Sequence, residues 1–478
     1  MQHIRTLETI FGEVACLEDK MALSTWHHVA IKESTPLTEA SSAEPGEEIS
    51  RLLGLESTRK AMEICLERLG SLEPDRIRDV ISWHSRWWRA ACLPGKLVAE
   101  LSKQCDRCKA MWERSDLHGN SRDIRRTFSH IVSLTREKAD IWRGTGTRYD
   151  ALLDVYDPGQ TTTSLTEQYG WLDNFGGAAS VPSSDLQARA TPAEALSVAQ
   201  EVAELCGFDH ERGRIVHGRH PMTLTTGSND VRILIGQGTN QAFLRQVLHE
   251  VGHAVLEQDL KMSVRWSWRA QTPSQAFHET IAKFFELSGP VLLRQYGSET
   301  SDASIGILYH RTLDCPSRGS EIGGKSTVRL ESTGLWYSWH IWLRFKLERM
   351  LIDGALEPPD VPDAWDQEVS RKFENSHAEP RTSWFQDIHW FMGLFGYFPV
   401  YWNAFAKGCI LREHFERKLG RCDSRSSLLS ILHRELRRSF MLEWNRVEKT
   451  QLRRLKNWDG VRNGMSKSDR ANISAFLL

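Results

Sequence analysis

Apolar residues recur at every third or fourth position through most of the 478-residue chain. This spacing places apolar side chains on one face of an α-helix, and it is clearest at residues 96–113, 126–142 and 191–209. Gly207, near the end of the last segment, is a typical helix stop. Because strands and helices do not alternate along the chain, the pattern argues against a parallel sheet and predicts a mostly α-helical fold.

Two polar, turn-rich stretches at residues 33–48 and 172–190 predict loops. One segment departs from the helical pattern: residues 213–236 hold short β-favouring runs divided by Gly, Pro and Asn-Asp turns. We therefore expect a small β-sheet immediately before the helix predicted at residues 241–259. The edge of such a sheet can bind an extended peptide backbone.

Composition and charge predict an ordinary globular protein. The chain is 40% hydrophobic and 26% charged, and its formal net charge of −1 creates no field toward nucleic acid or an anionic membrane. No apolar run reaches the roughly 18 residues of a membrane span, and the N-terminus lacks the apolar core of a secretory signal. Nine scattered cysteines predict reduced thiols and a cytoplasmic location. Cys105 and Cys108 have CxxC spacing, so a redox or zinc role is a minor alternative for that pair.

The stretch LRQVLHEVGHAVLEQ, residues 244–258, places two histidines four residues apart. On a helix His249 and His253 lie one turn apart on the same side, so both imidazoles can reach one metal ion. Glu250 is about 100° around the helix from His249, where it can contact a water at the metal without being a ligand. The alternative is an ordinary amphipathic helix that carries two histidines. Its buried stripe would consist of Phe243, Leu244, Val247, Leu248, Val251, Ala254 and Val255.

A catalytic zinc site requires three protein ligands and one open position, so a third ligand should exist. TPSQAFHETIAKFFELSGP, residues 272–290, predicts a second helix that starts near Thr272 and stops at Gly289. Glu279 lies off most of its apolar stripe, and Glu286 shares the face of Glu279. If the two helices are antiparallel neighbours, Glu279 completes a His₂Glu set and Glu286 can orient a ligand. A solvated helix charge is the alternative for Glu286.

Further motifs occur in an order that resembles a known family. They are YDALLDVYDPGQTT (149–162), His220-Pro221, NDVRI (229–233), HEVGHAVLEQ (249–258), FHETIAKFFE (277–286), LRFKLE (343–348), FQDIHW (385–390) and FGYFPVY (395–401). Over roughly residues 50–412, the chain resembles the carboxypeptidase Taq family of zinc-dependent metallocarboxypeptidases, which is related to the neurolysin-like peptidases.

The resemblance implies that one zinc ion per chain binds His249, His253 and Glu279, with cobalt or manganese as alternatives. It implies that Glu250 is the catalytic carboxylate. It also implies a mostly α-helical, two-lobed molecule with a deep central groove and a small β-sheet beside the HExxH helix. Family members are commonly homodimers and remove C-terminal residues with broad selectivity. Peptide substrates and a homodimer are therefore expected, whereas membrane and nucleic-acid partners are not.

We expect a single peptidase unit with three parts along the chain. These are an N-terminal helical part at about 1–150, a catalytic part at about 151–412 and a divergent basic C-terminal segment at about 413–478. For the last segment a solvated helix is the expected structure, and a nucleic-acid or partner role is the alternative.

The resemblance points to the FQDIHW–FGYFPVY region for the donors that stabilise an oxyanion. His389, Tyr397 and Tyr401 are the candidates there, and Tyr401 is also a substrate-binding candidate. The alternatives are groove-lining tyrosines and an interior histidine whose hydrogen bonds are satisfied.

A carboxypeptidase must also recognise a terminal carboxylate, which the planar fork of an arginine suits. Arg344 in LRFKLE is the first candidate, and its alternative is an ion pair with Glu348, four residues on. His220 is a second substrate-binding candidate. Arg232 is expected to be structural, held near Asp230.

Several residues depart from the family pattern. Leu234, Thr280, Ile281 and Ser383 stand where the family usually has Thr, Ser, Gln and Gly. These departures leave open a catalytically impaired, zinc-containing binding protein. The same helix pair also serves endopeptidases and dipeptidyl carboxypeptidases. The complete HEVGH…HE set favours an enzyme, because Glu250 has no purpose in a purely structural site.

Overall fold

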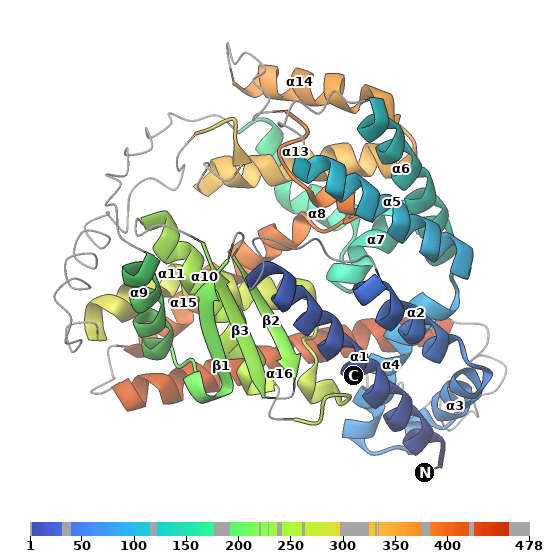
Figure 1. Cartoon of the computed structure of the whole chain (residues 1–478), viewed down its shortest axis with the longest axis horizontal. Helices are drawn as coiled ribbons and strands as arrows, with labels where there is room; N and C mark the ends of the chain where they lie inside the picture. The colour runs from blue at the N-terminus through green and yellow to red at the C-terminus, as the bar shows by residue number, and fades with distance from the viewer. Residues whose placement is uncertain are drawn as a thin grey trace. The chain divides into compact units, whose positions relative to one another are not determined.

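The computed structural model describes residues 2–30, 40–114, 122–144, 146–175, 192–218, 221–227, 229–236, 241–260, 263–296, 325–329, 332, 334–373, 383–419 and 425–457. Its helices are α1 (Gln2–Ala30), α2 (Ala40–Gly54), α3 (Glu56–Glu67), α4 (Pro74–Ala91), α5 (Gly95–Arg114), α6 (Arg122–Trp142), α7 (Arg148–Tyr156), α8 (Thr162–Tyr169), α9 (Pro192–Leu205), α10 (Gln241–Leu260), α11 (Gln275–Tyr296), α13 (Gly334–Asp353), α14 (Val361–Lys372), α15 (Pro399–Leu419) and α16 (Arg425–Asn457). The strands are β1 (Gly213–His217), β2 (Met222–Gly227) and β3 (Asp230–Ile235). The predicted mostly α-helical fold with one small sheet is confirmed (Figure 1).

The chain forms two compact units, each assembled from segments that are distant in sequence. Unit 1 comprises Met1–Ala91, Asp185–Cys315 and Ala404–Leu478, and unit 2 comprises Cys92–Ser184 and Pro316–Asn403. The expected division into parts at about 1–150, 151–412 and 413–478 has different boundaries from these two units and stays a prediction. The central groove also stays a prediction.

The sheet of unit 1 lies against the HExxH helix. Its strand order is β1-β3-β2, with β3 parallel to β1 and antiparallel to β2, so β2 is an edge strand. Val231, Ile233 and Ile235 of β3 are fully buried and share a hydrophobic core with α9, α10 and α11. Alternating side chains of a strand point to opposite faces, which explains why these three residues face the same layer. The predicted position of the sheet beside the histidine helix is therefore confirmed (Figure 1).

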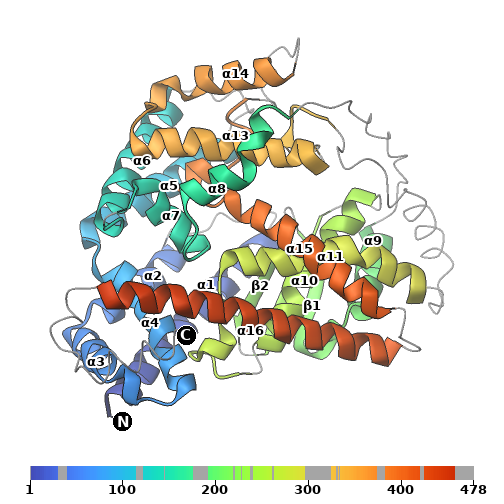
Figure 2. The same cartoon turned by 180° about the vertical axis from the view of Figure 1, so that it is seen from behind.

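Helix α16 supports the same core from the other side, where it packs on α11 (Figure 2). Its apolar residues recur every three or four positions, and that face is buried whereas most of its arginines are outside the core. The buried residues are Leu428, Leu432, Leu436, Phe440, Trp444 and Val447. The basic C-terminal segment thus contributes an amphipathic helix to the core of unit 1.

Unit 2 is built around aromatic side chains. Phe128 of α6 contacts Trp384, Phe391 and Phe395, with ring centroids 5.1, 5.6 and 6.4 Å away. Aromatic rings bury a large area each and prefer such tilted contacts. This cluster fixes the segment that carries the FQDIHW and FGYFPVY motifs.

Two predicted element boundaries were wrong. Residues 33–48 were expected to be a loop, but α2 begins at Ala40 and includes Pro45. Burial of Leu52 and Leu53 farther along α2 outweighs the local turn propensity, since tertiary packing overrides weak propensities. The helix expected to stop at Gly289 continues to Tyr296.

The remaining boundaries follow local signals. Helix α9 ends at Leu205, and Gly207 adopts a left-handed φ of 94°, which glycine tolerates best. Helix α11 begins at Gln275 rather than at Thr272, because the Ser274 hydroxyl accepts a hydrogen bond from the Phe277 N–H at 3.0 Å. Thr191 and most of the loop predicted at 172–190 lie outside the described residues.

Two other sequence questions concern the membrane and the CxxC pair. In the described part of the chain, no helix combines the length and apolar character needed to cross a bilayer.

Cys105 and Cys108 lie on α5, where burial raises their thiol pKa values to about 11 and about 12. Reactive or metal-binding cysteines need the thiolate, so this environment argues against a redox or zinc role.

Candidate active site

The close packing of α10 on α11 brings the candidate metal ligands together. His249 and His253 lie one turn apart on α10, with ring centroids 4.8 Å apart. A Cβ on Gly252 would lie 2.8 Å from the Cα of Ala282, and a Cβ on Gly289 would lie 2.4 Å from Leu248 Cδ2. Both glycines therefore allow an approach that any side chain would block. Gly289 is a packing residue and not the predicted helix stop.

This approach carries Glu279 of α11 to the two imidazoles. Its Oε2 is 3.4 Å from His249 Nε2, and its Oε1 is 3.9 Å from His253 Nε2. One ligand atom from each of the three residues lies within 4.8 Å of the others. Zinc–ligand bonds of about 2.0–2.2 Å in a tetrahedron separate ligand atoms by roughly 3.3–3.6 Å. The three side chains therefore fit a zinc-type metal site, with two nitrogens and one carboxylate as donors.

Glu286 lies behind His249, as its shared helix face with Glu279 predicts. Its Oε2 is 3.5 Å from His249 Nδ1, the ring nitrogen that does not face Glu279. Lys283 forms an ion pair with the same carboxylate. A carboxylate on the outer nitrogen of a metal-binding histidine fixes the tautomer and orientation of the ring.

His253 is held by a different neighbour. The His278 ring stacks on it with centroids 4.1 Å apart and planes 17° apart. His278 Nε2 is 3.2 Å from Glu257 Oε1, and Thr225 of β2 donates a hydrogen bond of 2.9 Å to Glu257 Oε2. A chain of contacts therefore links the edge strand to the candidate ligand.

Glu250 is buried and also contacts the edge strand. The Thr223 hydroxyl lies 2.8 Å from Glu250 Oε2 and 3.0 Å from the Glu250 carbonyl oxygen, both within hydrogen-bonding distance. The carboxylate is thus fixed by a residue of β2 rather than by its own helix.

Burial and mutual contacts shift the acid–base properties of these groups. Burial raises the pKa of Glu250. Burial would lower the pKa of His249, but the carboxylates of Glu279 and Glu286 outweigh it and raise this pKa to about 10. Burial alone would raise the pKa of Glu279, but the neighbouring histidines hold this pKa well below its usual range. The site is thus a dense set of coupled charges, which is typical of metal and catalytic centres.

His389, Tyr397 and Tyr401 gather in unit 2. Tyr401 Oη is 3.5 Å from His389 Nε2, and the two tyrosine rings are 5.5 Å apart between centroids. The centroids of His389 and Tyr397 are 5.8 Å apart. The structure therefore assembles the three predicted residues into one cluster, whereas their roles stay predictions.

Arg344 is 1% exposed and forms an ion pair with Asp387, not with Glu348. Its Nη1 also donates to the His340 carbonyl oxygen at 2.9 Å, and its guanidinium lies 4.8 Å from the centroid of Trp365. The fork proposed for a substrate carboxylate is therefore already engaged by a protein carboxylate.

Arg329 is a residue that the sequence analysis missed. It lies on the other side of Asp387, donating from Nε at 2.9 Å and from Nη2 at 2.7 Å. Burial alone would raise the pKa of Asp387, but Arg329 and Arg344 together lower it. Two buried guanidinium groups on one carboxylate leave an excess positive charge in this cluster.

The other two candidates have different outcomes. His220 lies outside the described residues. Arg232 pairs with Asp230 at 2.6 Å and lies 5.0 Å from the ring centroid of Trp26, so its predicted structural role agrees with its contacts.

The sequence analysis also missed Thr223, His278 and Glu257. His278 directly precedes Glu279 in the FHETIAKFFE motif, and this adjacency was a usable signal. Glu257 lies in the HEVGHAVLEQ motif, four residues after His253, which was a usable signal as well. Thr223 carried no such signal.

An HExxH helix with a glutamate supplied by its neighbouring helix defines this protein as an HExxH-type metallopeptidase. A sequence profile of the Carboxypeptidase Taq (M32) metallopeptidase family matches residues 30–438. The chain therefore belongs to this family, and it is a metallocarboxypeptidase.

Individual relatives agree with this assignment. Thermostable carboxypeptidase 1 of Thermus thermophilus is 29% identical over 357 residues, which cover 68% of this chain and 68% of that protein. Carboxypeptidase 1 of Bacillus subtilis is 22% identical over 384 residues, covering 77% and 76%.

Solved structures show the same fold. Metallocarboxypeptidase 1 of Trypanosoma cruzi gives a TM-score of 0.74 at 19% identity and covers 100% of this chain and 99% of that chain. The M32 carboxypeptidase of Deinococcus radiodurans gives 0.75 at 19% identity and covers 94% and 95%.

Proposed function

We propose that the enzyme is a zinc-dependent carboxypeptidase with broad specificity that removes residues from the C-termini of peptides, with Glu250 as general base. The observation that carries this proposal is the arrangement of His249, His253 and Glu279 next to a buried Glu250. Zinc held by these three residues supplies Lewis acidity, which lowers the pKa of water and polarises a carbonyl group. Cobalt or manganese can supply similar chemistry.

Glu250 accepts the proton of the attacking water and returns it to the leaving amine. Thr223 orients this carboxylate by the hydrogen bond to Oε2, so that the other oxygen, Oε1, remains available for the proton transfer. Glu286 and His278 act on the ligands themselves, the first through His249 and the second by stacking on His253. The edge strand β2 is the proposed support for an extended substrate backbone.

Tyr397 and His389 are the proposed donors to the oxyanion of the tetrahedral intermediate, and Tyr401 is proposed to bind substrate. Their clustering in unit 2 supports a shared role, because preorganised donors need no rearrangement during the reaction. His220 remains a substrate-binding candidate on sequence grounds.

Arg344 remains the proposed cation for the substrate carboxylate, but it acts as part of a cluster. Arg344 and Arg329 share Asp387, and this sum of charges leaves one positive charge uncompensated. The charge attracts a carboxylate even though the Arg344 fork itself is engaged. This differs from the direct bidentate contact expected from the sequence.

The test compares a blocked peptide that has a free C-terminal carboxylate with its C-terminal amide. The wild-type enzyme should prefer the free acid by about thirty-fold to several-thousand-fold in kcat/KM, since an unpaired, partly desolvated cation costs roughly 2–5 kcal/mol. Arg344→Lys keeps the charge and loses the fork, so it should keep much of the preference, whereas Arg344→Ala should lose it.

Other results would contradict parts of this proposal. Equal cleavage of both peptides by the wild type favours an endopeptidase. No cleavage by a protein with its full metal content favours a zinc-containing binding protein. A preference that survives in Arg344→Ala assigns the carboxylate to another cation.

We also propose that the protein is a cytoplasmic homodimer. The free cysteines of the described residues support a reducing compartment, and the family resemblance supports the dimer. Light scattering after size-exclusion chromatography tests the dimer, and a mass near 55 kDa, that of the 54.7 kDa chain alone, would contradict it.

A further inference from the structure

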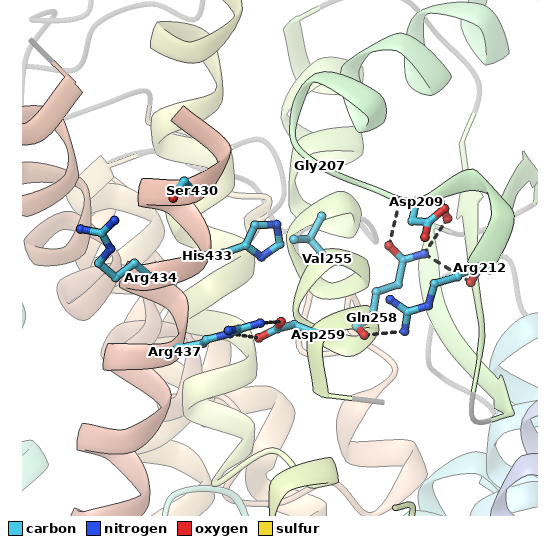
Figure 3. A pocket seen from close by; sticks show the side chains of 10 residues that line it. All are labelled: Gly207, Asp209, Arg212, Val255, Gln258, Asp259, Ser430, His433, Arg434 and Arg437. Atoms are coloured by element: carbon cyan, nitrogen blue, oxygen red, sulfur yellow. Dashed lines mark hydrogen bonds and ion pairs between the residues drawn. The ribbon is translucent and has the colours of Figure 1, made fainter. Parts of the chain in front are cut away.

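Buried polar contacts join distant segments in both units. In unit 1, the buried Gln258 near the end of α10 accepts a hydrogen bond from the Asp209 N–H at 2.9 Å and donates to the Asp209 carbonyl oxygen at 2.8 Å (Figure 3). Arg437 of α16 pairs at 3.0 Å with Asp259, the next residue of α10, and these residues line a cavity of about 630 Å³. In unit 2, the carboxylate of Glu348 joins three segments.

Glu348 lies on α13, is fully buried and accepts hydrogen bonds on both of its oxygens. Tyr149 Oη of α7 donates to Oε2 at 2.6 Å, and the Gly396 N–H donates to the same oxygen at 2.9 Å. Trp390 Nε1 donates to Oε1 at 2.5 Å. Burying a carboxylate is costly unless hydrogen bonds compensate for its lost hydration. These three donors therefore fix the position of the carboxylate, and the carboxylate fixes theirs.

Two of the three donors are sequence neighbours of the proposed oxyanion donors. Trp390 directly follows His389, and Gly396 directly precedes Tyr397. Because both bonds end on one carboxylate, they hold the two ends of the segment at a set distance from each other. The His389 and Tyr397 rings at these ends have centroids 5.8 Å apart.

Helix α7 supports the same segment. The ring of Tyr156 meets that of Tyr397 nearly at a right angle, at 81°, with centroids 5.1 Å apart. Gly396 has a left-handed φ of 88°, and a Cβ there would lie 3.0 Å from the carbonyl carbon of Leu152, so its backbone lies directly on α7. Tyr149 belongs to the same helix. The motif YDALLDVYDPGQTT, which contributes no metal ligand, thus supports Tyr397.

Glu348 has no access to substrate. It is fully buried, and donors from the protein engage both of its oxygens. Arg344, one turn earlier on α13, pairs with Asp387, so the Glu348 contacts are separate from the cluster proposed to attract the substrate carboxylate. Any effect of Glu348 on the reaction therefore acts through the residues that it holds.

We propose that Glu348 is a positioning residue that sets the placement of His389 and Tyr397 for the carboxypeptidase reaction. The inference rests on the proposed role of these two side chains as oxyanion donors. Preorganised donors act on charge that develops in the transition state, and loss of one typically lowers kcat by about 10²–10³. Displacing them should therefore lower kcat and leave KM nearly unchanged, because the lost interaction is made only in the transition state.

Trp390→Phe tests this proposal with a small change, since it removes the indole N–H bond to Glu348 and keeps an aromatic ring. With the metal-loaded full-length enzyme and a blocked peptide that has a free C-terminus, kcat should fall about tenfold or more and KM should stay within about threefold. Trp83→Phe is the matched control, because it removes an indole N–H bond of 2.8 Å to the Trp266 carbonyl oxygen in unit 1. This control should keep the wild-type kcat.

Two variants of Glu348 extend the test. Glu348→Gln keeps the size of the side chain and one acceptor oxygen, but its amide group places N–H bonds where a donor already points, so kcat should fall. Glu348→Leu loses all three bonds and should lower kcat further, toward the factor of about 10²–10³ expected for a lost donor. The glutamine thus rescues part of the loss. Each variant is assayed below its own unfolding temperature, and Trp390→Phe decides the question if the leucine variant does not fold.

The Tyr397→Phe background separates positioning from a general loss of structure. Tyr397→Phe alone should lower kcat by about 10²–10³ if the hydroxyl is an oxyanion donor. Trp390→Phe should then lower kcat by a smaller factor in this background than in the wild type, because the positioned hydroxyl is already absent. Independent structural damage would instead give the same factor in both backgrounds.

Three outcomes would overturn the proposal. The first is a kcat in Trp390→Phe and Glu348→Gln that equals that of the Trp83→Phe control. The second is an equal effect of Trp390→Phe in the wild type and in the Tyr397→Phe background. Both leave the oxyanion role of Tyr397 intact. The third is a wild-type kcat in Tyr397→Phe, which removes that role itself and with it the present inference.

Discussion

The hydroxyl of Thr223 on the edge strand lies 2.8 Å from Oε2 of Glu250 on the metal helix. This contact joins the sheet to the proposed general base. It also explains how a carboxylate on a helix can be held in one orientation by a residue of another element.

Replacing Thr223 with Val should lower kcat by about two- to tenfold and leave KM and metal content nearly unchanged. The valine keeps the shape of the side chain but cannot donate the hydrogen bond, whose net contribution is typically about 0.5–1.5 kcal/mol. Steady-state kinetics and metal analysis measure these quantities. Thr226→Val, which loses a hydroxyl directed to the Asp230 carbonyl oxygen, is the matched control. Equal effects of both variants would assign Thr223 a structural role only.

Glu250→Gln should keep its metal and lose peptidase activity by about 10²–10⁴ or more, because an amide of nearly the same size cannot accept a proton. The rate on a blocked peptide and the metal content of the same preparation provide the measurement. Activity within about threefold of the wild type would exclude Glu250 as the base.

Glu279→Ala should lose its metal much faster than the wild type on dialysis. The substitution removes one of three donors whose atoms lie within 4.8 Å of one another. Metal content over time, measured by mass spectrometry, is the test. If the variant retains one tightly bound metal per chain, another residue is the third ligand.

His278→Leu should bind zinc about 10–100-fold more weakly, the range typical for residues that orient a metal ligand. The leucine fills space but cannot maintain the stack on His253 or the contact with Glu257. Competition with a chromophoric chelator measures the affinity, and His414→Leu on α15, away from the ligands, is the control. If His278 positions a ligand, the chelator should remove zinc from His278→Leu at a lower chelator concentration than from His414→Leu. Equal concentrations for the two variants would contradict this role.

The stability of unit 2 should fall as the pH rises toward 7 because of Glu348. Its carboxylate accepts hydrogen bonds from Tyr149 Oη at 2.6 Å and Gly396 N at 2.9 Å, yet its complete burial raises its pKa to about 7. An unfolded glutamate has a pKa of about 4.3, so the folded state binds the proton more tightly. The contribution, about 4 kcal/mol, is therefore present below about pH 4 and is lost as the pH passes through about 7.

Urea unfolding of the wild type and Glu348→Gln between pH 5 and 8 measures this effect. The free energy of unfolding of the wild type minus that of the variant should fall as the pH rises from 5 to 8, because the wild type loses its bound proton whereas the glutamine does not titrate. A constant difference across the range would show that Glu348 keeps the same charge state throughout.

Local periodicity determined much of this protein. The spacing of His249 and His253 fixes their shared helix face by itself, and the apolar stripe from Phe243 to Val255 fixes which face of α10 is buried. The sequence likewise predicted the sheet at 213–236 and the helix that carries Glu279, because these signals are contained within single segments. The ordered motifs then indicated the family.

Only the tertiary structure decided which residues from different segments meet. Gly289 looks like a helix stop in the sequence, but the requirement for close packing against Leu248 keeps it inside α11. From the sequence, the guanidinium group of Arg344 was expected to bind a substrate carboxylate. In the fold, it is hydrogen-bonded to Asp387, 43 residues away. Thr223 meets Glu250 only because β2 lies on α10. Periodicity describes one element at a time, whereas such contacts depend on how elements pack, and packing is set by side-chain volumes summed over many distant residues.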